Sequence, residues 1–103
     1  MKPVIIVSTF PNKTSITKIA NQLVKKKLVA CVNIMKISSV YSWKGKIENQ
    51  PEYLGLFKTT KKNQPVLKKE LRKLHPYDIP EIAEINVDSI NQAYLKWLVD
   101  STR

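Results

Sequence analysis

The sequence predicts a single α+β domain, and three observations lead to that fold class. Its 103 residues suffice for one hydrophobic core. Segments of helical periodicity alternate with segments of period two, in the order strand, helix, strand, strand, helix, strand, helix. Right-handed crossovers make the first two strands parallel, and likewise the last two, while a hairpin joins the middle pair. This pattern predicts a ferredoxin-like βαββαβ sandwich over residues 1–103, with a long hairpin and an extra C-terminal helix.

The N-terminal third predicts a buried strand followed by an amphipathic helix. Residues 4–7 form a continuous β-branched run, which is typical of a strand covered on both faces. Asn12 or Thr14 can cap the helix that follows. Its apolar positions recur at helical spacing and predict one apolar stripe, formed by Ile16, Ile19, Ala20, Leu23 and Val24.

A long hairpin is expected over residues 29–59, with its turn near Lys44–Lys46. Pro51 predicts a bend or bulge in the second arm, because proline cannot donate to a strand ladder. Arms of about 14 residues span roughly 46 Å, whereas a compact domain of this length is only about 33 Å across.

Either the arms bend sharply, with the aromatic residues of the tip folded back into the core, or the tip of this hairpin projects beyond the domain. An exposed ribbon with free edges pairs readily with another chain, and a second copy is the simplest partner. The sequence thus predicts a closed oligomer in which copies cover the apolar tip residues Val40, Tyr41, Trp43 and Ile47.

The C-terminal half predicts a helix, a strand and a final helix. Pro65 suits the first turn of a helix whose buried stripe is Leu67, Leu71 and Leu74, and His75–Pro76 ends it. Alternation from Ile79 to Val87 predicts the fourth strand. The apolar face of the last helix should consist of Ile90, Ala93, Tyr94, Trp97 and Leu98.

The charge balance is unusual, with 18 basic and 8 acidic residues and a net charge of +10. Sixteen of the basic residues are lysines scattered along the chain, which indicates a solvated surface rather than a specific nucleic-acid site. No apolar run approaches the roughly 20 residues that span a membrane. The short apolar start lacks the features of a signal peptide, and the single Cys31 cannot form an internal disulfide. We therefore expect a cytoplasmic protein with no membrane contact.

Few residues offer chemistry. His75 is the only histidine, and it can serve as a metal ligand, a pH-sensing group or a structural hydrogen-bond partner. Cys31 is either a core residue or a soft metal ligand. A metal site would need these two side chains to converge with carboxylates such as Glu52 and Glu81, because the sequence has no local metal motif. With two glycines there is no phosphate-binding loop, so we expect no enzymatic activity and no cofactor needed for folding.

Five segments together resemble the CutA family of divalent-cation tolerance proteins. They follow one another from about Val4 to Leu98 and are residues 27–33, 40–47, 58–60, 75–82 and 94–98. The resemblance implies a homotrimer that exchanges hairpin strands, and binding of Cu(II) or another divalent metal ion as part of a response to metal ions. It implies subunit-interface residues Tyr41, Trp43, Glu52, Tyr77 and Trp97, and our hypothesis for the metal ligands is His75 with Cys31 or Glu52 from across the interface.

Two positions depart from the pattern of some relatives. Ser8 and Leu74 stand where those relatives carry a cysteine and a second histidine, so this chain keeps only His75 of that set. Two other functions stay open. The resemblance to signalling proteins of this architecture implies a small-ligand sensor with intersubunit clefts. The βαββαβ order also occurs in RNA-recognition domains, which need aromatic residues on the two central strands.

Overall fold

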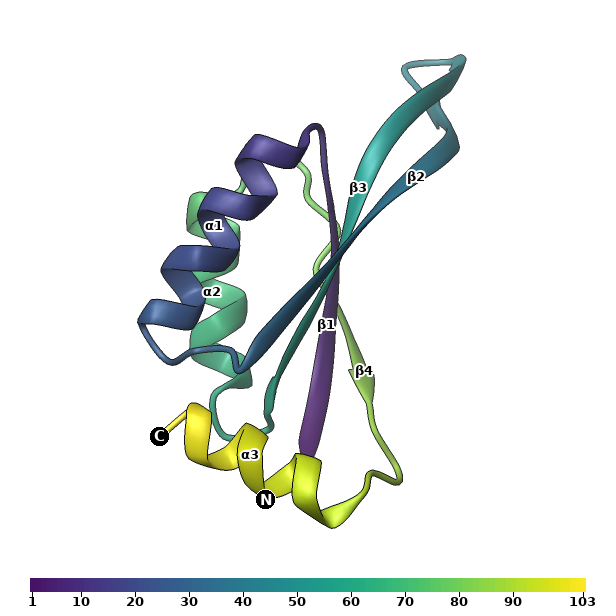
Figure 1. The fold of residues 1–103 in the computed structure, drawn as a ribbon. Helices are drawn as coiled ribbons and strands as arrows, with labels where there is room; N and C mark the ends of the chain where they lie inside the picture. Colours follow the sequence, from purple (N-terminus) through teal and green to yellow (C-terminus); the bar gives the residue numbers. More distant parts are fainter.

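The computed structural model describes residues 1–103 and has the predicted order of elements. The elements are β1 (Pro3–Phe10), α1 (Lys13–Lys25), β2 (Cys31–Trp43), β3 (Lys46–Thr60), α2 (Gln64–Leu74), β4 (Ala83–Asn86) and α3 (Gln92–Ser101). The strands form one sheet in the order β2-β3-β1-β4, and every neighbouring pair is antiparallel. The helices α1 and α2 lie on one face of this sheet (Figure 1), so the predicted ferredoxin-like α+β fold is confirmed.

The hydrophobic core lies between the sheet and the two helices. The sheet contributes Ile6, Phe10 and Phe57 to this core. The helices α1 and α2 contribute apolar stripes that are almost completely buried: Ile16, Ile19, Leu23, Leu67 and Leu71. Each such side chain stabilises the fold by roughly 1.5–3 kcal/mol relative to exposure. Gly55 lets α1 approach closely, since an added Cβ would lie 2.5 Å from Phe57 Cε1 and 2.8 Å from Ile16 Cδ1.

The ends of the helices follow local sequence signals. Asn12 caps α1, its Oδ1 accepting a hydrogen bond from the backbone N–H of Ser15 at 2.8 Å. Pro65 occupies the first turn of α2, and His75 ends that helix in an extended conformation.

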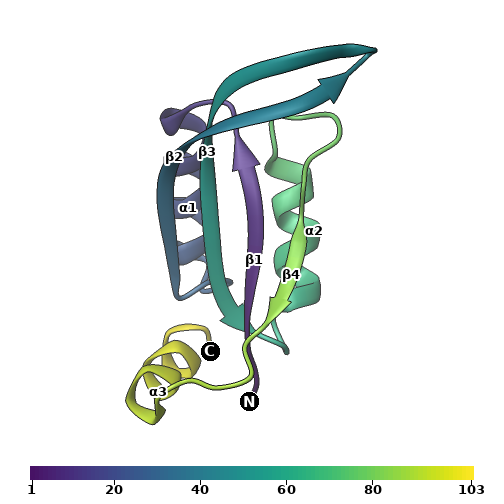
Figure 2. The same ribbon diagram turned by 90° about the vertical axis from the view of Figure 1, so that its right-hand side faces the viewer.

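The structure refines three of the sequence predictions. Val24 is 43% exposed, because its position on α1 faces away from the sheet. The fourth strand has only the four residues of β4, because the chain from Ile79 to Ile82 forms a loop against the end of β1. In α3 only Leu98 is buried, and Trp97 is exposed because the helix lies beyond the end of the sheet opposite the hairpin tip (Figure 2).

The face of the sheet away from α1 and α2 is also apolar. Residues of β1 alternate between the core and this open sheet face, and the strand registers place the same kind of residue beside them. The open sheet face carries the polar or weakly polar residues Thr9, Cys31, Asn33 and Lys58 and a larger apolar set: Ile5, Val7, Met35, Ile37, Leu54, Leu56, Ala83 and Ile85. Antiparallel sheets with a solvated face usually alternate apolar and polar residues. Here most residues on both faces are apolar, and α1 and α2 cover only one of the faces.

The β2–β3 hairpin extends beyond the rest of the molecule, as the sequence predicted (Figure 1). The molecule measures 45 × 26 × 21 Å along its principal axes. β1 pairs with β3 only from Tyr53 to Thr60, so residues 46–52 of β3 have a neighbour on one edge alone. At the tip, Val40 and Ile47 are 69% and 70% exposed.

The expected irregularity at Pro51 is a bend without a bulge. Residues of β2 and β3 pair one to one throughout, Pro51 lying opposite Ser38. The two arms bend together past the end of β1 (Figure 2). Proline is tolerated there because this part of β3 forms an edge.

Candidate functional site

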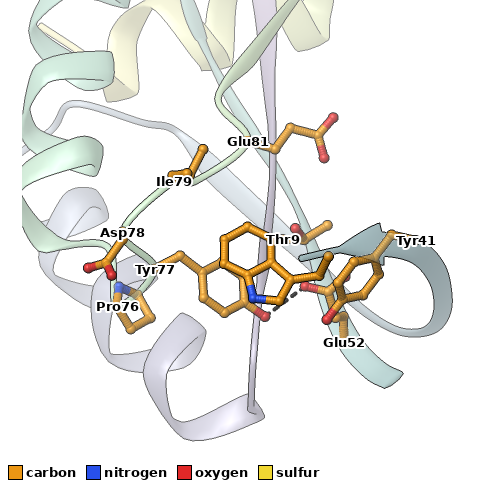
Figure 3. Close-up of a pocket in the computed structure, with 9 residues that line it drawn as sticks. Thr9, Tyr41, Glu52, Pro76, Tyr77, Asp78, Ile79 and Glu81 are labelled. Carbon is orange, nitrogen blue, oxygen red and sulfur yellow. Dashed lines mark hydrogen bonds between the residues drawn. The ribbon is translucent and has the colours of Figure 1, made fainter. Parts of the chain in front are cut away.

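An open groove of about 500 Å³ lies where the hairpin leaves the body of the sheet. The end of β1 contributes Thr9, the hairpin contributes Tyr41, Trp43 and Glu52, and the loop after α2 contributes the remaining wall (Figure 3): Pro76, Tyr77, Asp78, Ile79 and Glu81. The groove exists because the hairpin bends and the Pro76–Ile82 loop closes back on β1.

The centre of the groove is a hydrogen bond between Tyr77 and Glu52 (Figure 3). The hydroxyl of Tyr77 donates to Glu52 Oε2 at 2.7 Å. Burial, and then this hydrogen bond to Glu52, raise the pKa of Tyr77 above its ordinary value near 10. The Glu52 residue is only 8% exposed, and no Lys, Arg or His side chain lies within salt-bridge distance of it. A buried carboxyl group without a cationic neighbour is uncommon.

The groove has the opposite charge to the molecule as a whole. Glu52, Asp78 and Glu81 line it, which is three of the eight acidic residues of the chain, and none of the eighteen basic residues does. A cleft lined by one sign of charge concentrates ions of the other sign. This groove therefore favours cations although the net charge of the chain is +10.

His75 lies behind the groove in a chain of hydrogen bonds. The backbone N–H of Tyr77 donates to His75 Nδ1 at 3.1 Å, so that nitrogen carries no proton. The neutral ring therefore has its proton on Nε2, which donates to Ser8 Oγ at 3.1 Å. The hydroxyl of Ser8 in turn donates to the carbonyl oxygen of Glu81 at 2.5 Å. This chain joins the loop after α2 to β1.

Burial keeps the imidazole neutral. His75 is 9% exposed and stacks on Phe10 with 4.2 Å between ring centroids. Desolvation lowers the pKa of His75, and a backbone hydrogen bond with Thr9 and the charge of Glu52 oppose this only in part. Neither ring nitrogen has a free lone pair, so His75 could bind a metal ion only after giving up one of these hydrogen bonds. Ser8 supplies a hydroxyl here where a cysteine would supply a thiolate.

The other predicted ligand lies elsewhere. Cys31 begins β2 opposite Lys58, at the far end of the sheet from the groove. Its neighbour Val32 packs against the helix-side core, so the alternation of the strand places the Cys31 side chain on the open sheet face. His75 packs in the core on the other face with Phe10. One chain therefore does not bring Cys31 and His75 together.

The structure gathers four of the predicted site residues and separates the rest. Tyr41, Trp43, Glu52 and Tyr77 line the groove, whereas Trp97 lies on α3 with its ring 5.4 Å from that of Tyr94. No three His, Cys, Asp or Glu side chains of the chain are placed to hold a metal ion together. A complete site would require donors from a second chain.

Sequence reasoning missed four lining residues, Thr9, Pro76, Asp78 and Ile79. Asp78 lies within residues 75–82, one of the five segments that resemble the CutA family, and this membership could have marked it as a candidate site residue. Thr9 had no such signal, because its role depends on where β1 ends relative to the loop.

Comparison with known proteins identifies the family. The sequence profile of the CutA1 divalent ion tolerance protein matches residues 4–101. A relative from Pyrococcus horikoshii, the divalent-cation tolerance protein CutA, is 40% identical over 97% of this chain and 98% of its own. The CutA from Thermotoga maritima is 41% identical over 95% of this chain and 97% of its own length. The chain belongs to the CutA1 divalent ion tolerance family.

Solved CutA structures share the fold described above. The crystal structure of CutA1 from P. horikoshii superposes with a TM-score of 0.94 over 97% of this chain and 98% of its own, at 39% identity. A structure described as the periplasmic divalent cation tolerance protein CutA from Archaeoglobus fulgidus has a TM-score of 0.94. It is 32% identical over 98% of this chain and 99% of its own. None of the helices in the present chain is long and apolar enough to cross a membrane.

Proposed function

We propose that this CutA protein is a homotrimer that binds Cu(II) or another divalent metal ion in the groove at each subunit junction. The divalent ion is the ligand to which the protein responds, and it is not needed for folding. The acidic groove beside the protruding hairpin is the observation that carries this proposal.

Two surfaces support self-association. The open sheet face presents apolar side chains from all four strands, with Met35 and Ile85 about half exposed. The outer part of the hairpin has free edges and carries exposed Tyr41 and Trp43. Exposed apolar faces and free strand edges mark protein–protein contacts. A second copy would supply a strand for the edge and cover the aromatic rings, and three copies in a closed ring would leave no free interface.

The electrostatics and ligand chemistry support cation binding in the groove. Glu52 has one oxygen bonded to Tyr77 and is otherwise without a partner, and Asp78 and Glu81 are exposed beside it. Carboxylates bind divalent ions in general, and a soft ion would add nitrogen or sulfur donors. In the trimer, Cys31 could reach a groove only from another copy, and His75 would first have to release Ser8 or the Tyr77 N–H.

Titration calorimetry with Cu(II) and Zn(II) on the reduced protein tests this proposal. We expect Glu52→Gln to weaken binding about tenfold or more, because it removes the buried carboxylate charge. Asp88→Asn is the matched control, since it removes one negative charge at an exposed position outside the groove. His75→Ala and Cys31→Ser test whether the imidazole and the thiol contribute.

Two results decide between the parts of the proposal. Equal affinity of Glu52→Gln and the unaltered protein would rule out the groove as the metal site. Unchanged affinity of His75→Ala or of Cys31→Ser would remove that residue from the ligand set and leave the carboxylates.

A small-ligand sensor is the second candidate, and the aromatic wall of the groove favours it. A cavity of about 500 Å³ with Tyr41, Trp43 and Tyr77 could bury an organic molecule. Thermal-shift screening of small metabolites against the unaltered protein and Trp43→Ala tests it. In both candidates we expect the groove to bind a ligand without catalysis. Behind it, Ser8 donates its proton to the carbonyl of Glu81, so Ser8 and His75 do not form a nucleophile–base pair. The expected cytoplasmic location remains a prediction.

Recognition of RNA bases has little support. On the two central strands, β1 and β3, the open sheet face carries Ile5, Val7, Leu54 and Leu56 rather than aromatic rings. The aromatic residues of β3, Tyr53 and Phe57, pack against the core. Base stacking on the sheet therefore has no platform.

A further inference from the structure

The positive charge of the chain is concentrated in the helix layer. Residues 13–27 and 61–74, which contain α1 and α2 and the residues that flank them, hold eleven basic side chains and one acidic one. The rest of the chain holds seven basic and seven acidic side chains. The net charge of +10 therefore arises from these two segments, which lie away from both the open sheet face and the groove.

On the faces of α1 and α2 that point away from the sheet, the layer carries five basic side chains. On α1, Lys18 and Lys25 are seven residues apart and lie opposite the buried Ile16, Ile19 and Leu23. On α2, Lys69, Arg72 and Lys73 lie opposite the buried Leu67 and Leu71. The two helices lie side by side (Figure 1), and the 2.7 Å ion pair between Lys26 and Glu70 joins them. We call Lys18, Lys25, Lys69, Arg72 and Lys73 the basic helix surface.

These five side chains are exposed and available. None of them takes part in a salt bridge, whereas Lys26, Lys61 and Lys68 in the same layer are paired with Glu70 or Glu84. Like charges gathered without counter-charges repel one another and lower stability. An anionic partner on this surface would relieve that repulsion.

We infer that the basic helix surface binds the phosphate backbone of duplex nucleic acid, without regard to base sequence. A duplex presents one negative charge about every 1.7 Å along its axis, and lysine ammonium groups neutralise phosphates as point charges. Sequence readout of guanine uses mainly the arginine fork, and Arg72 is the only arginine on the surface. This inference is independent of the trimer and of the metal site.

Other polyanions fit the surface less well. Single strands bind by stacking on aromatic rings, and residues 13–27 and 61–74 contain none. Helices that bind membranes insert an apolar face with Trp, Phe or Leu, but the apolar stripes of α1 and α2 are buried against the sheet. Val24 and Val66 are the only exposed large apolar residues on these helices.

Fluorescence anisotropy with a labelled random-sequence DNA duplex, measured over a range of salt concentrations, tests this inference. Contact of all five charges with phosphates predicts a slope of about −4.5 for log K against log salt concentration. The triple variant Lys25→Gln, Lys69→Gln, Lys73→Gln should reduce the slope to about −1.8 and weaken binding at low salt more than tenfold.

The matched control removes three charges outside the helix layer, in Lys2→Gln, Lys36→Gln, Lys46→Gln, and should bind within about twofold of the unaltered protein. Light scattering on both triple variants checks that their assembly is unchanged. Equal losses in the two variants, or no salt-dependent binding by the unaltered protein, would overturn the inference. So would a marked preference for one duplex sequence, or binding to phosphatidylserine vesicles without binding to the duplex.

Discussion

Removing the Tyr77 hydroxyl tests how the groove is held together. In Tyr77→Phe the ring can keep its place beside His75, 5.2 Å away between centroids, so the change is confined to the hydrogen bond. The Glu52 carboxyl, 8% exposed, then loses the one protein group that donates to it. A hydrogen bond to a charged group contributes about 1.5–3 kcal/mol, and a buried acceptor left without a donor loses that amount.

The expected loss in the free energy of unfolding is therefore about 1.5–3 kcal/mol, or roughly 10–150-fold in the unfolding equilibrium constant. Urea unfolding followed by tryptophan fluorescence, at pH 7 and at one fixed chain concentration, measures it. The double variant Tyr77→Phe, Glu52→Leu should lose less than Tyr77→Phe alone, because it leaves no acceptor unpaired.

The same pair predicts a pH dependence with a definite sign. Because the pKa of Tyr77 is raised, the folded protein keeps the phenolic proton at a pH above 10 at which the unfolded chain releases it. The free energy of unfolding should therefore fall as the pH rises past 10, and Tyr77→Phe should lack this part of the decline. A free energy of unfolding for Tyr77→Phe within about 0.5 kcal/mol of that of the unaltered protein at pH 7 would refute the reasoning. So would an identical decline of the free energy of unfolding above pH 10 in the two proteins.

Two further predictions concern His75 and Gly55. Since His75 is the only histidine, one NMR titration reports its pKa, which should lie below the ordinary value near 6.5. Stability should accordingly fall as the pH drops through that lowered pKa, and a pKa at or above 6.5 would contradict the buried neutral ring. Gly55→Ala should lower the free energy of unfolding by about 1–3 kcal/mol, because its Cβ would overlap Phe57 and Ile16. Thermal unfolding indistinguishable from that of the unaltered protein would show that α1 can move away.

Much of the fold could be predicted because local signals and burial agreed. Asn12, Pro65 and the residue pair His75–Pro76 mark helix ends through backbone chemistry that acts within a few residues. The length of the hairpin predicted its overhang from geometry alone. Periodicity alone did not reveal that Val24, at the margin of the helical stripe, lies on the outer side of α1 and is partly exposed.

The candidate site was harder to predict because it is assembled from distant segments. Glu52 and Tyr77 meet through the bend of the hairpin and the path of the loop after α2, and neither is encoded by local periodicity. The sequence singled out His75 as a candidate but gave no indication of its partners. Ser8 and the carbonyl of Glu81 lie on one side of the ring, and the Tyr77 N–H lies on the other. This arrangement depends on how β1 ends beside that loop. Spacing could not reveal that Cys31 and His75 lie on opposite faces of the sheet.

The proposed trimer is tested most directly by the mass of the particle in solution. Multi-angle light scattering on the purified protein, over a range of dilutions near neutral pH, should give three times the 11.9 kDa mass of the chain. The unpaired hairpin edges and the apolar open sheet face would then be covered by sister chains. A monodisperse particle with the mass of one chain would show that both surfaces are stable in water, and it would contradict the account.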